Sequence, residues 1–204
     1  MASLSLPSPR AARTRAALIA AGFELLAERP IDAIPIDDFV ARASVGKGSF
    51  FNHFIDKQDF AEAIAAEVRL ELETWVVRAN EGIADPVERI ARGMHVCADF
   101  ALSQPTRTII LLRSQASSTL RAYSLNRGLV EDFDAACAQG LLRNEARDAG
   151  MVYWLGLCQI LMTNLIERKR SAAEANQRVK SLVLLGLSGL GITDDQAARL
   201  SAIE

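Results

Sequence analysis

The sequence is poor in the residues that build metal centres, disulfide scaffolds and catalytic clusters. Its 204 residues include only three cysteines, Cys97, Cys137 and Cys158, and two histidines, His53 and His95. The cysteines are odd in number and form no CxxC pair, so we expect reduced core thiols rather than a disulfide framework or a zinc site. His95 and Cys97 stand two residues apart, which directs them to different faces of a helix and excludes a nucleophile pair. We therefore expect no metal, no cofactor and no enzymatic activity.

Glycine and proline are also scarce, at 12 and 6 residues, which excludes collagen-like and linker-dominated chains. The chain is 50% hydrophobic with a net charge of -2, and this balance excludes a disordered protein. Its length is sufficient to bury a large core in one or two domains.

The small negative net charge does not favour a nucleic-acid binder, because such domains are usually basic. The charge is unevenly placed, however. Arg10, Arg13 and Arg15 precede the first acid, Glu24. A DNA-binding function would therefore depend on a few placed contacts rather than on a broad basic surface.

One segment raises the question of a membrane, because the run between Asp148 and Glu167 carries no charge and is near the lower length limit for a spanning helix. A membrane-associated hairpin over 148–192 is one interpretation. A helix that is apolar all round is as often buried in a globular protein, and the N-terminus lacks the apolar core of a signal peptide. We expect a cytoplasmic protein with no membrane partner.

Strand signals are nearly absent, and the pattern predicts an all-α protein of about nine helices. A flexible arm is expected over 1–9, a small three-helix domain over 10–57 and a larger bundle over 58–204. The predicted helices cover 10–28, 35–43, 47–54, 56–78, a segment from 86, then 105–113, 120–138, 145–169 and 172–190, with a terminal turn from 193. Asp56, Asp85 and Ser171 are the expected N-caps of three of them.

Residues 35–54 carry the most information, because two short helices there are joined by a tight turn at 44–46. Their apolar positions can close a small core, and their polar positions stay on one exposed side of the second helix. This layout is typical of a helix-turn-helix, although simple packing of three short helices remains an alternative. Lysine suits the guanine edge and asparagine the adenine edge in a major groove. The candidate DNA-binding residues are Lys47, Gly48, Ser49, Phe51, Asn52, His53 and Lys57.

One stretch of the sequence resembles the N-terminal domain of the tetracycline-repressor (TetR) family. It comprises LIAAGFELL at 18–26 and the block ASVGKGSFFNHF at 43–54, with Lys57 shortly after. The resemblance covers about residues 14–62, and beyond it only the succession of long helices is similar. It implies a ligand-responsive transcriptional regulator, usually a repressor, which binds a near-palindromic operator as a homodimer.

Several positions depart from the pattern of that family. Phe51 stands where a tyrosine is usual, so a hydroxyl bond to phosphate is lost, and Gly46 replaces a capping serine or threonine. Pro35 and Pro30 replace a threonine and a glycine at helix boundaries. Asp37 occupies a position that in relatives can approach DNA, where an acid repels phosphate or accepts from a cytosine amino group.

The resemblance also implies that the middle helices, about 57–142, enclose a small-molecule pocket. The scarcity of aromatics predicts a mainly aliphatic pocket and an apolar or amphipathic effector. For each candidate taken singly, core packing or a solvated face is the competing interpretation. The candidates are Trp75, His95, Phe100, Arg113, Tyr123, Trp154 and Gln159.

The helices at 145–169 and 172–190 are the expected dimer interface, with Gly186, Ser188 and Gly189 permitting close approach; ordinary intrachain core is the alternative. A small helical enzyme is a further alternative, but the sequence offers no paired catalytic motif. An effector would act by shifting populations, with the long helix after Asp56 as the lever.

Overall fold

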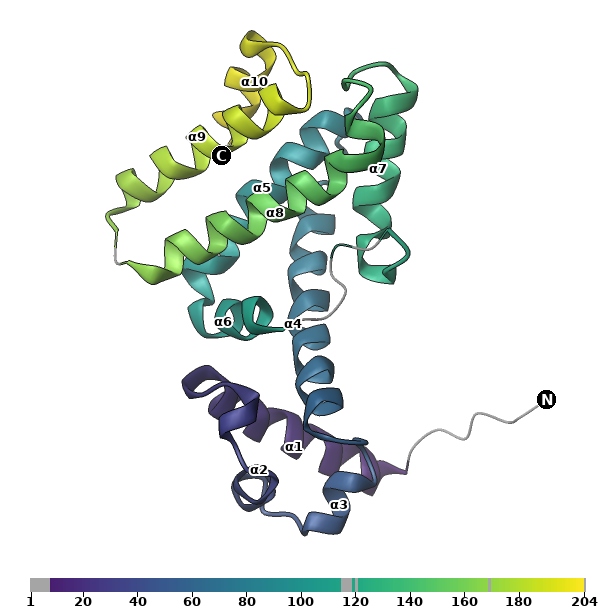
Figure 1. The fold of residues 1–204 in the computed structure, drawn as a ribbon, viewed down its shortest axis with the longest axis vertical. Helices are drawn as coiled ribbons and strands as arrows, with labels where there is room; N and C mark the ends of the chain where they lie inside the picture. Colours follow the sequence, from purple (N-terminus) through teal and green to yellow (C-terminus); the bar gives the residue numbers. More distant parts are fainter. Residues whose placement is uncertain (1–7, 115–118, 120, 169, 204) are drawn as a thin grey trace, which may run out of the picture. The chain divides into compact units, whose positions relative to one another are not determined.

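The computed structural model describes residues 8–114, 119, 121–168 and 170–203, and these form an all-α structure of ten α-helices and two 3-10 helices (Figure 1). The predicted fold class is confirmed, and the expected terminal turn is a complete tenth helix. The α-helices are α1 (Pro9–Glu28), α2 (Ile36–Arg42), α3 (Lys47–Phe51), α4 (Lys57–Ala79), α5 (Pro86–Ser103), α6 (Pro105–Arg113), α7 (Arg127–Ala138), α8 (Ala146–Glu167), α9 (Ala172–Gly189) and α10 (Asp194–Ser201). The 3-10 helices are η1 (Ile31–Ala33) and η2 (Ser124–Asn126).

The chain divides into two compact units, Met1–Glu67 and Val68–Glu204. The division falls inside α4, ten residues beyond the predicted domain limit at residue 57. Most of the predicted arm at 1–9 lies outside the described residues. Ser8 is described, and its hydroxyl accepts a hydrogen bond from the Ala11 amide at 3.3 Å as the N-cap of α1.

The helix starts follow the capping residues that the sequence indicates. The Asp56 carboxylate accepts from the Asp59 amide at 2.9 Å, and that of Asp85 accepts from the Val87 amide at 2.8 Å. At α9, a capping box joins Ser171 and Glu174. These side chains satisfy amides that a helix leaves free at its first turn. All three predicted caps are confirmed.

Two predicted helices are too long. The helix expected over 120–138 begins at Arg127, and residue 120 lies outside the described part of the chain. Asn126 is buried there, and its side-chain oxygen accepts from Arg69 at 3.0 Å, which fixes a turn immediately before α7. The helix expected over 47–54 ends at Phe51, where the amides of His53 and Phe54 both bond the Phe50 carbonyl and tighten the last turn.

The N-terminal unit is built around interlocking phenylalanine rings. Phe60 of α4 lies against Phe39, Phe50 and Phe54, with ring centroids 4.9, 5.2 and 4.7 Å away. Edge-to-face packing of this kind adds to the gain from burial. Gly22 lets α1 approach these rings, because a Cβ there would stand 2.7 Å from the Phe60 ring. The short helices are thereby fixed on α1 and the start of α4.

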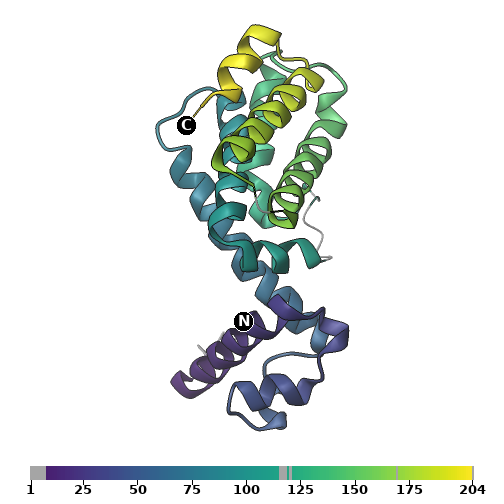
Figure 2. The ribbon, with the colours of Figure 1, turned by 90° about the vertical axis from the view of Figure 1, so that its left-hand side faces the viewer.

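In the C-terminal unit, α8 packs against α5, α6, α7 and α9 (Figures 1 and 2). Trp154 is 1% exposed, and a Cβ at Gly186 of α9 would stand 2.7 Å from its ring. A Cβ at Gly189 would likewise clash with Tyr153. The expectation that these glycines serve a contact between subunits is therefore corrected: they allow close approach of α8 and α9 within one chain.

Helix α8 is long and apolar enough to cross a membrane by length and composition, and it is the one such helix among the described residues. This is weak evidence for a membrane protein, because a core helix of a globular domain meets the same criterion. Here α8 contacts four neighbouring helices of its own unit.

Candidate nucleic-acid interface and effector cavity

Helices α2 and α3 form a helix-turn-helix whose turn is tightly closed. Ser44 adopts a left-handed backbone conformation with φ of 56°, and the Val45 amide donates to the Val40 carbonyl at 3.0 Å. A short polar side chain tolerates this conformation better than a bulky one. Gly46 caps α3 without a side-chain hydrogen bond, as the sequence predicts.

Helix α3 is buried on one side and exposed on the other. Phe50 is fully buried among the phenylalanine rings, whereas Phe51 is 52% exposed. Lys47, Gly48 and Asn52 are exposed beside Phe51. The structure thus brings these four predicted residues together on one accessible face, and the half-buried Ser49 and His53 border it.

The lysine at the head of α3 is paired with an acid in the free protein. Its ammonium lies 2.9 Å from the Asp37 carboxylate of α2, and both side chains are more than half exposed. An exposed pair of this kind contributes about 0–1 kcal/mol. Lys47 is therefore free to exchange Asp37 for a phosphate or a base edge at low cost.

Lys57 has a different environment from the one that the sequence indicates. Its ammonium donates to the backbone carbonyls of Ile31, Asp32 and Ile34 at 3.3, 3.4 and 3.1 Å. Lys57 thus joins the start of α4 to the η1 turn before α2. The predicted DNA contact through Lys57 would require the loss of these bonds, so we assign it a positioning role in the free protein.

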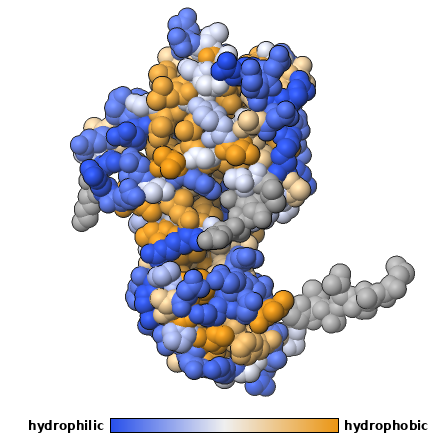
Figure 3. Space-filling view, in the orientation of Figure 1, coloured by the Kyte–Doolittle hydropathy of each residue, from blue (hydrophilic) through white to orange (hydrophobic). Residues whose placement is uncertain are grey.

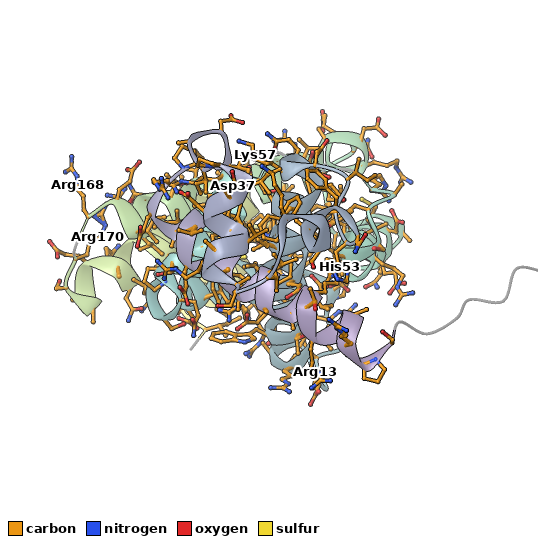
Figure 4. All side chains as sticks on the ribbon, turned by 90° about the horizontal axis from the view of Figure 1, so that it is seen from below. Arg13, Asp37, His53, Lys57, Arg168 and Arg170 are labelled. Carbon is orange, nitrogen blue, oxygen red and sulfur yellow. The ribbon has the colours of Figure 1, made fainter. Side chains whose placement is uncertain are left out.

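Most other cations of the N-terminal unit are also paired with acids. The pairs are Arg15–Glu67, Arg29–Asp38 and Arg42–Glu24. Among the described residues, Arg10 and Arg13 near the start of α1 form no ion pair; the Arg13 guanidinium donates to the Pro9 carbonyl. In Figure 4, His53 lies between Arg13 on one side and Asp37 and Lys57 on the other. Arg10 and Arg13 are thus available for phosphate contacts. Candidate DNA contacts therefore lie on α1 as well as on α3.

The C-terminal unit contains a cavity of about 320 Å³ between α4, α5, α7 and α8. Its wall includes apolar side chains, among them Trp154, Leu155 and Leu129, as well as charged and amide side chains. Two cysteine thiols also line it, Cys97 and Cys158. They are hydrogen-bonded to each other, and this contact together with burial raises the pKa of Cys158.

Two ion pairs lie in the wall of the cavity. Arg89 of α5 contacts Asp132 of α7 at 2.6 Å, and Arg69 lies 3.6 Å from Glu73 one turn along α4. Burial raises the pKa of both carboxyl groups, and it outweighs the opposing effect of the neighbouring guanidinium in each case. The cavity surface is thus mainly apolar, and it carries in addition charged groups that the sequence does not predict there.

Of the seven predicted effector residues, Trp154 alone lines this cavity. Gln159 lines a smaller cavity of about 50 Å³ beside it. The others lie elsewhere: Trp75 stacks edge-on against the buried Phe100, Arg113 ends α6, Tyr123 precedes η2, and His95 bonds the Leu200 carbonyl near α10. Burial lowers the pKa of His95, which favours its neutral form in that position.

Sequence reasoning missed the polar residues of α4, and Asn80 directly after it, that line the cavity. Arg69, Glu73 and Asn80 recur at helical spacing and form one stripe, together with Val76 and Val77. This spacing is a signal that could have found them. A charged stripe on a long helix is ordinarily assigned to a solvated face, and only the packing of α5 and α7 over it shows otherwise.

The sequence model of one protein family, the bacterial regulatory proteins of the tetR family, matches residues 18–64 of the chain. This segment includes the whole helix-turn-helix. No curated protein sequence is similar enough to count as a relative.

Solved structures of similar fold include two TetR-family transcription regulators and RolR. A tetR family transcription regulator from Shewanella sp. PV-4 is 14% identical with a TM-score of 0.76, over 87% of this chain and 97% of that one. A TetR-family regulator from Pectobacterium atrosepticum is 24% identical with a TM-score of 0.63, over 91% and 97%. RolR in complex with resorcinol is 17% identical with a TM-score of 0.64, over 97% of each chain. At these identities the likeness shows a shared fold.

Proposed function

The N-terminal domain belongs to the TetR family of bacterial regulatory proteins, and on this premise we propose that the chain is a repressor that a small molecule releases from a palindromic operator. The match of the family model to residues 18–64 and the fold shared with TetR-family transcription regulators support a DNA-binding regulator. The repressor role, the effector and the operator symmetry are our proposal.

The observation that carries the proposal is the exposed face of α3. A lysine, an asparagine and an exposed ring project from a helix that a buried phenylalanine holds in place. Side chains of these types read base edges and contact phosphates in a major groove. We propose Lys47, Gly48, Ser49, Phe51, Asn52 and His53 as the DNA-binding residues, with Arg10 and Arg13 on phosphates.

Selection of bound fragments from random double-stranded DNA by the purified protein tests the DNA-binding part. We expect a sequence with two-fold symmetry and half-sites about one helical turn apart, bound with a steep dependence on salt. Loss of enrichment in Lys47→Ala, with enrichment retained in the matched surface variant Lys180→Ala of α9, would assign the selection to α3. Failure to enrich any sequence at low salt would contradict the proposal.

We propose that two copies pair through α8 and α9. These helices run side by side, and exposed apolar side chains remain on them: Val152, Tyr153 and Ile160 on α8 and Leu185 on α9 (Figure 2). Figure 3 shows hydrophobic surface gathered over the C-terminal unit, on the side where α8 is in view. A partner that covers this surface would give a four-helix interface and would place two recognition helices on one operator.

The cavity of the C-terminal unit supports the effector part of the proposal. Its volume is at the lower end of the range typical of small-molecule sites. RolR, of similar fold, has been solved with resorcinol bound. We propose that a ligand in this cavity favours a geometry unsuited to DNA, and that α4 transmits the change because its residues both line the cavity and enter the phenylalanine core.

A small helical enzyme receives no support from the site. Within the described parts of the chain, no group of three or more His, Cys, Asp or Glu side chains could hold a metal ion. We propose a cytoplasmic location, where the operator would be found. Release of the selected DNA by a compound screened at millimolar concentration would test the effector role directly.

A further inference from the structure

The wall of the cavity between α4, α5, α7 and α8 includes hydrogen-bond acceptors that the described residues leave without a hydrogen bond. The side-chain oxygen of Asn80 is buried in its wall and has no hydrogen-bond partner. Glu73 has no hydrogen bond either; its nearest cation, Arg69, stands at 3.6 Å, beyond hydrogen-bond distance. Glu73 lines the cavity, so a ligand donor there would offset the cost of burying a carboxylate that has no hydrogen bond.

The two guanidinium groups of the wall are already occupied. Arg89 donates to the Asp132 carboxylate at 2.6 Å and to the carbonyls of Ile83 and Ala84 at 2.8 and 3.0 Å. Arg69 donates to the buried Asn126 at 3.0 Å. Arg89 thus has its donors engaged, and the charge of Arg69 is opposed by Glu73 at 3.6 Å, so the structure favours a carboxylate or phosphate in this cavity less than a cation.

The carboxylates of the wall affect each other. Burial raises the pKa of Glu73, and the nearby negative charge of Asp132 raises it further. Burial is also the main cause of the raised pKa of Asp132. A positive charge placed between the two groups would offset both their desolvation and their mutual repulsion.

The cavity also provides an apolar surface for the rest of a ligand. Trp154, Leu129 and Leu155 line it, and Gly93 leaves space, because a Cβ there would meet no atom within 4 Å. On this basis, and within the proposed function, we propose that the effector is a small organic cation, a primary or secondary amine with an apolar body, whose ammonium lies against Glu73 and Asp132.

The test uses three ligands with the same body and different polar groups: cyclohexylmethylamine, cyclohexylmethanol and cyclohexanecarboxylate. Binding to the full chain without DNA is followed by NMR of the indole N–H signals. The chain has two tryptophans, and Trp154 lines the cavity whereas Trp75 does not. Trp75→Phe assigns the two signals. We expect the amine to shift the Trp154 signal and to bind at least tenfold more tightly than the alcohol, with no binding of the carboxylate.

Glu73→Gln should weaken binding of the amine roughly tenfold to a hundredfold and leave binding of the alcohol nearly unchanged, because only the amine interacts with the negative charge of Glu73. Glu71→Gln is the matched control: Glu71 lies on the same helix and pairs with Arg107 at 2.8 Å, outside the cavity wall. Equal or tighter binding of the alcohol or carboxylate by the wild-type protein, or no binding of any of the three, would overturn the ligand class. Those results leave the regulator function standing. Binding of the amine without release of DNA would instead contradict the effector role.

Discussion

The ammonium of Lys47 lies 2.9 Å from the carboxylate of Asp37, so the cation that we assign to DNA is held by an acid of the preceding helix. DNA must therefore compete with Asp37 for Lys47. The competition is mild, because both side chains are exposed, but it lowers the contribution of the one cation that α3 itself carries.

Asp37→Asn should raise DNA affinity roughly twofold to fivefold at low salt, because it frees Lys47 and removes a negative charge near phosphate. Fluorescence anisotropy with the selected operator and a scrambled duplex measures the change. The gain should appear on both duplexes. Asp195→Asn in α10 makes the same change of charge in the C-terminal unit and should have little effect; weaker binding by Asp37→Asn would show that Asp37 itself contacts DNA.

Lys47→Ala should weaken operator binding roughly fivefold to a hundredfold and reduce the salt dependence by about one ion. Binding measured from low to moderate salt gives both quantities. In a double-mutant cycle, Asp37→Asn should give a smaller gain once Lys47 is absent, because only the removal of a negative charge near phosphate then remains. Additive effects of the two changes would contradict the competition between Asp37 and DNA.

Phe51→Tyr should strengthen DNA binding by about 1 kcal/mol, roughly fivefold, because it adds a hydroxyl donor to an exposed ring at the end of α3. Thermal unfolding should be unchanged, since the para position lies on the exposed side. Phe50→Tyr is the contrasting variant: its ring is fully buried, and an added hydroxyl there should lower the melting temperature. Unchanged affinity in Phe51→Tyr would place the ring away from phosphate.

Ile160→Asp should convert the dimer into monomers at micromolar concentration, because a charge would be buried where the partner covers α8. Light scattering after size exclusion measures the mass, and operator binding should fall with it. Leu102→Asp changes a similarly exposed leucine on α5 and should leave the mass unchanged. A monomeric wild-type protein would contradict the α8–α9 interface.

Glu73→Gln should raise the melting temperature at pH 7.5. Burial raises the pKa of Glu73 in the folded protein, so the folded state binds the proton more tightly than the unfolded chain. The stability that this group contributes is present in acid and is lost as pH rises through the raised pKa. Glutamine cannot ionise, so the gain in melting temperature of Glu73→Gln over the wild-type protein should disappear towards pH 4. A lower melting temperature at both pH values would show that the ion pair with Arg69 dominates.

The helix-turn-helix was predictable because its determinants are local. Phe39 and Phe50 lie on the two short helices that one tight turn joins, and the block at 43–54 falls within the segment that the family model matches. The capping residues Asp85 and Ser171 were predictable for the same reason, since each bonds an amide within three residues.

The cavity could not be predicted from local pattern. Glu73 and Asp132 belong to helices far apart in sequence, and nothing in either segment indicates that both face one hollow. Lys57 is similar: its three carbonyl partners precede it by more than 20 residues. The sequence predicts that the glycines of α9 permit close helix approach, but it does not show that their partners, Trp154 and Tyr153, lie in the same chain.

Helix α4 belongs to both units and contains neither glycine nor proline among its 23 residues. Its backbone amides therefore form one hydrogen-bonded ladder from the phenylalanine core to the cavity wall, roughly 35 Å long at 1.5 Å per residue. Opening of this ladder is cooperative, so occupancy at Glu73 should slow the exchange of amide hydrogens with solvent around Ile64. The rate of amide hydrogen exchange in the N-terminal unit should therefore report whether a ligand occupies the cavity.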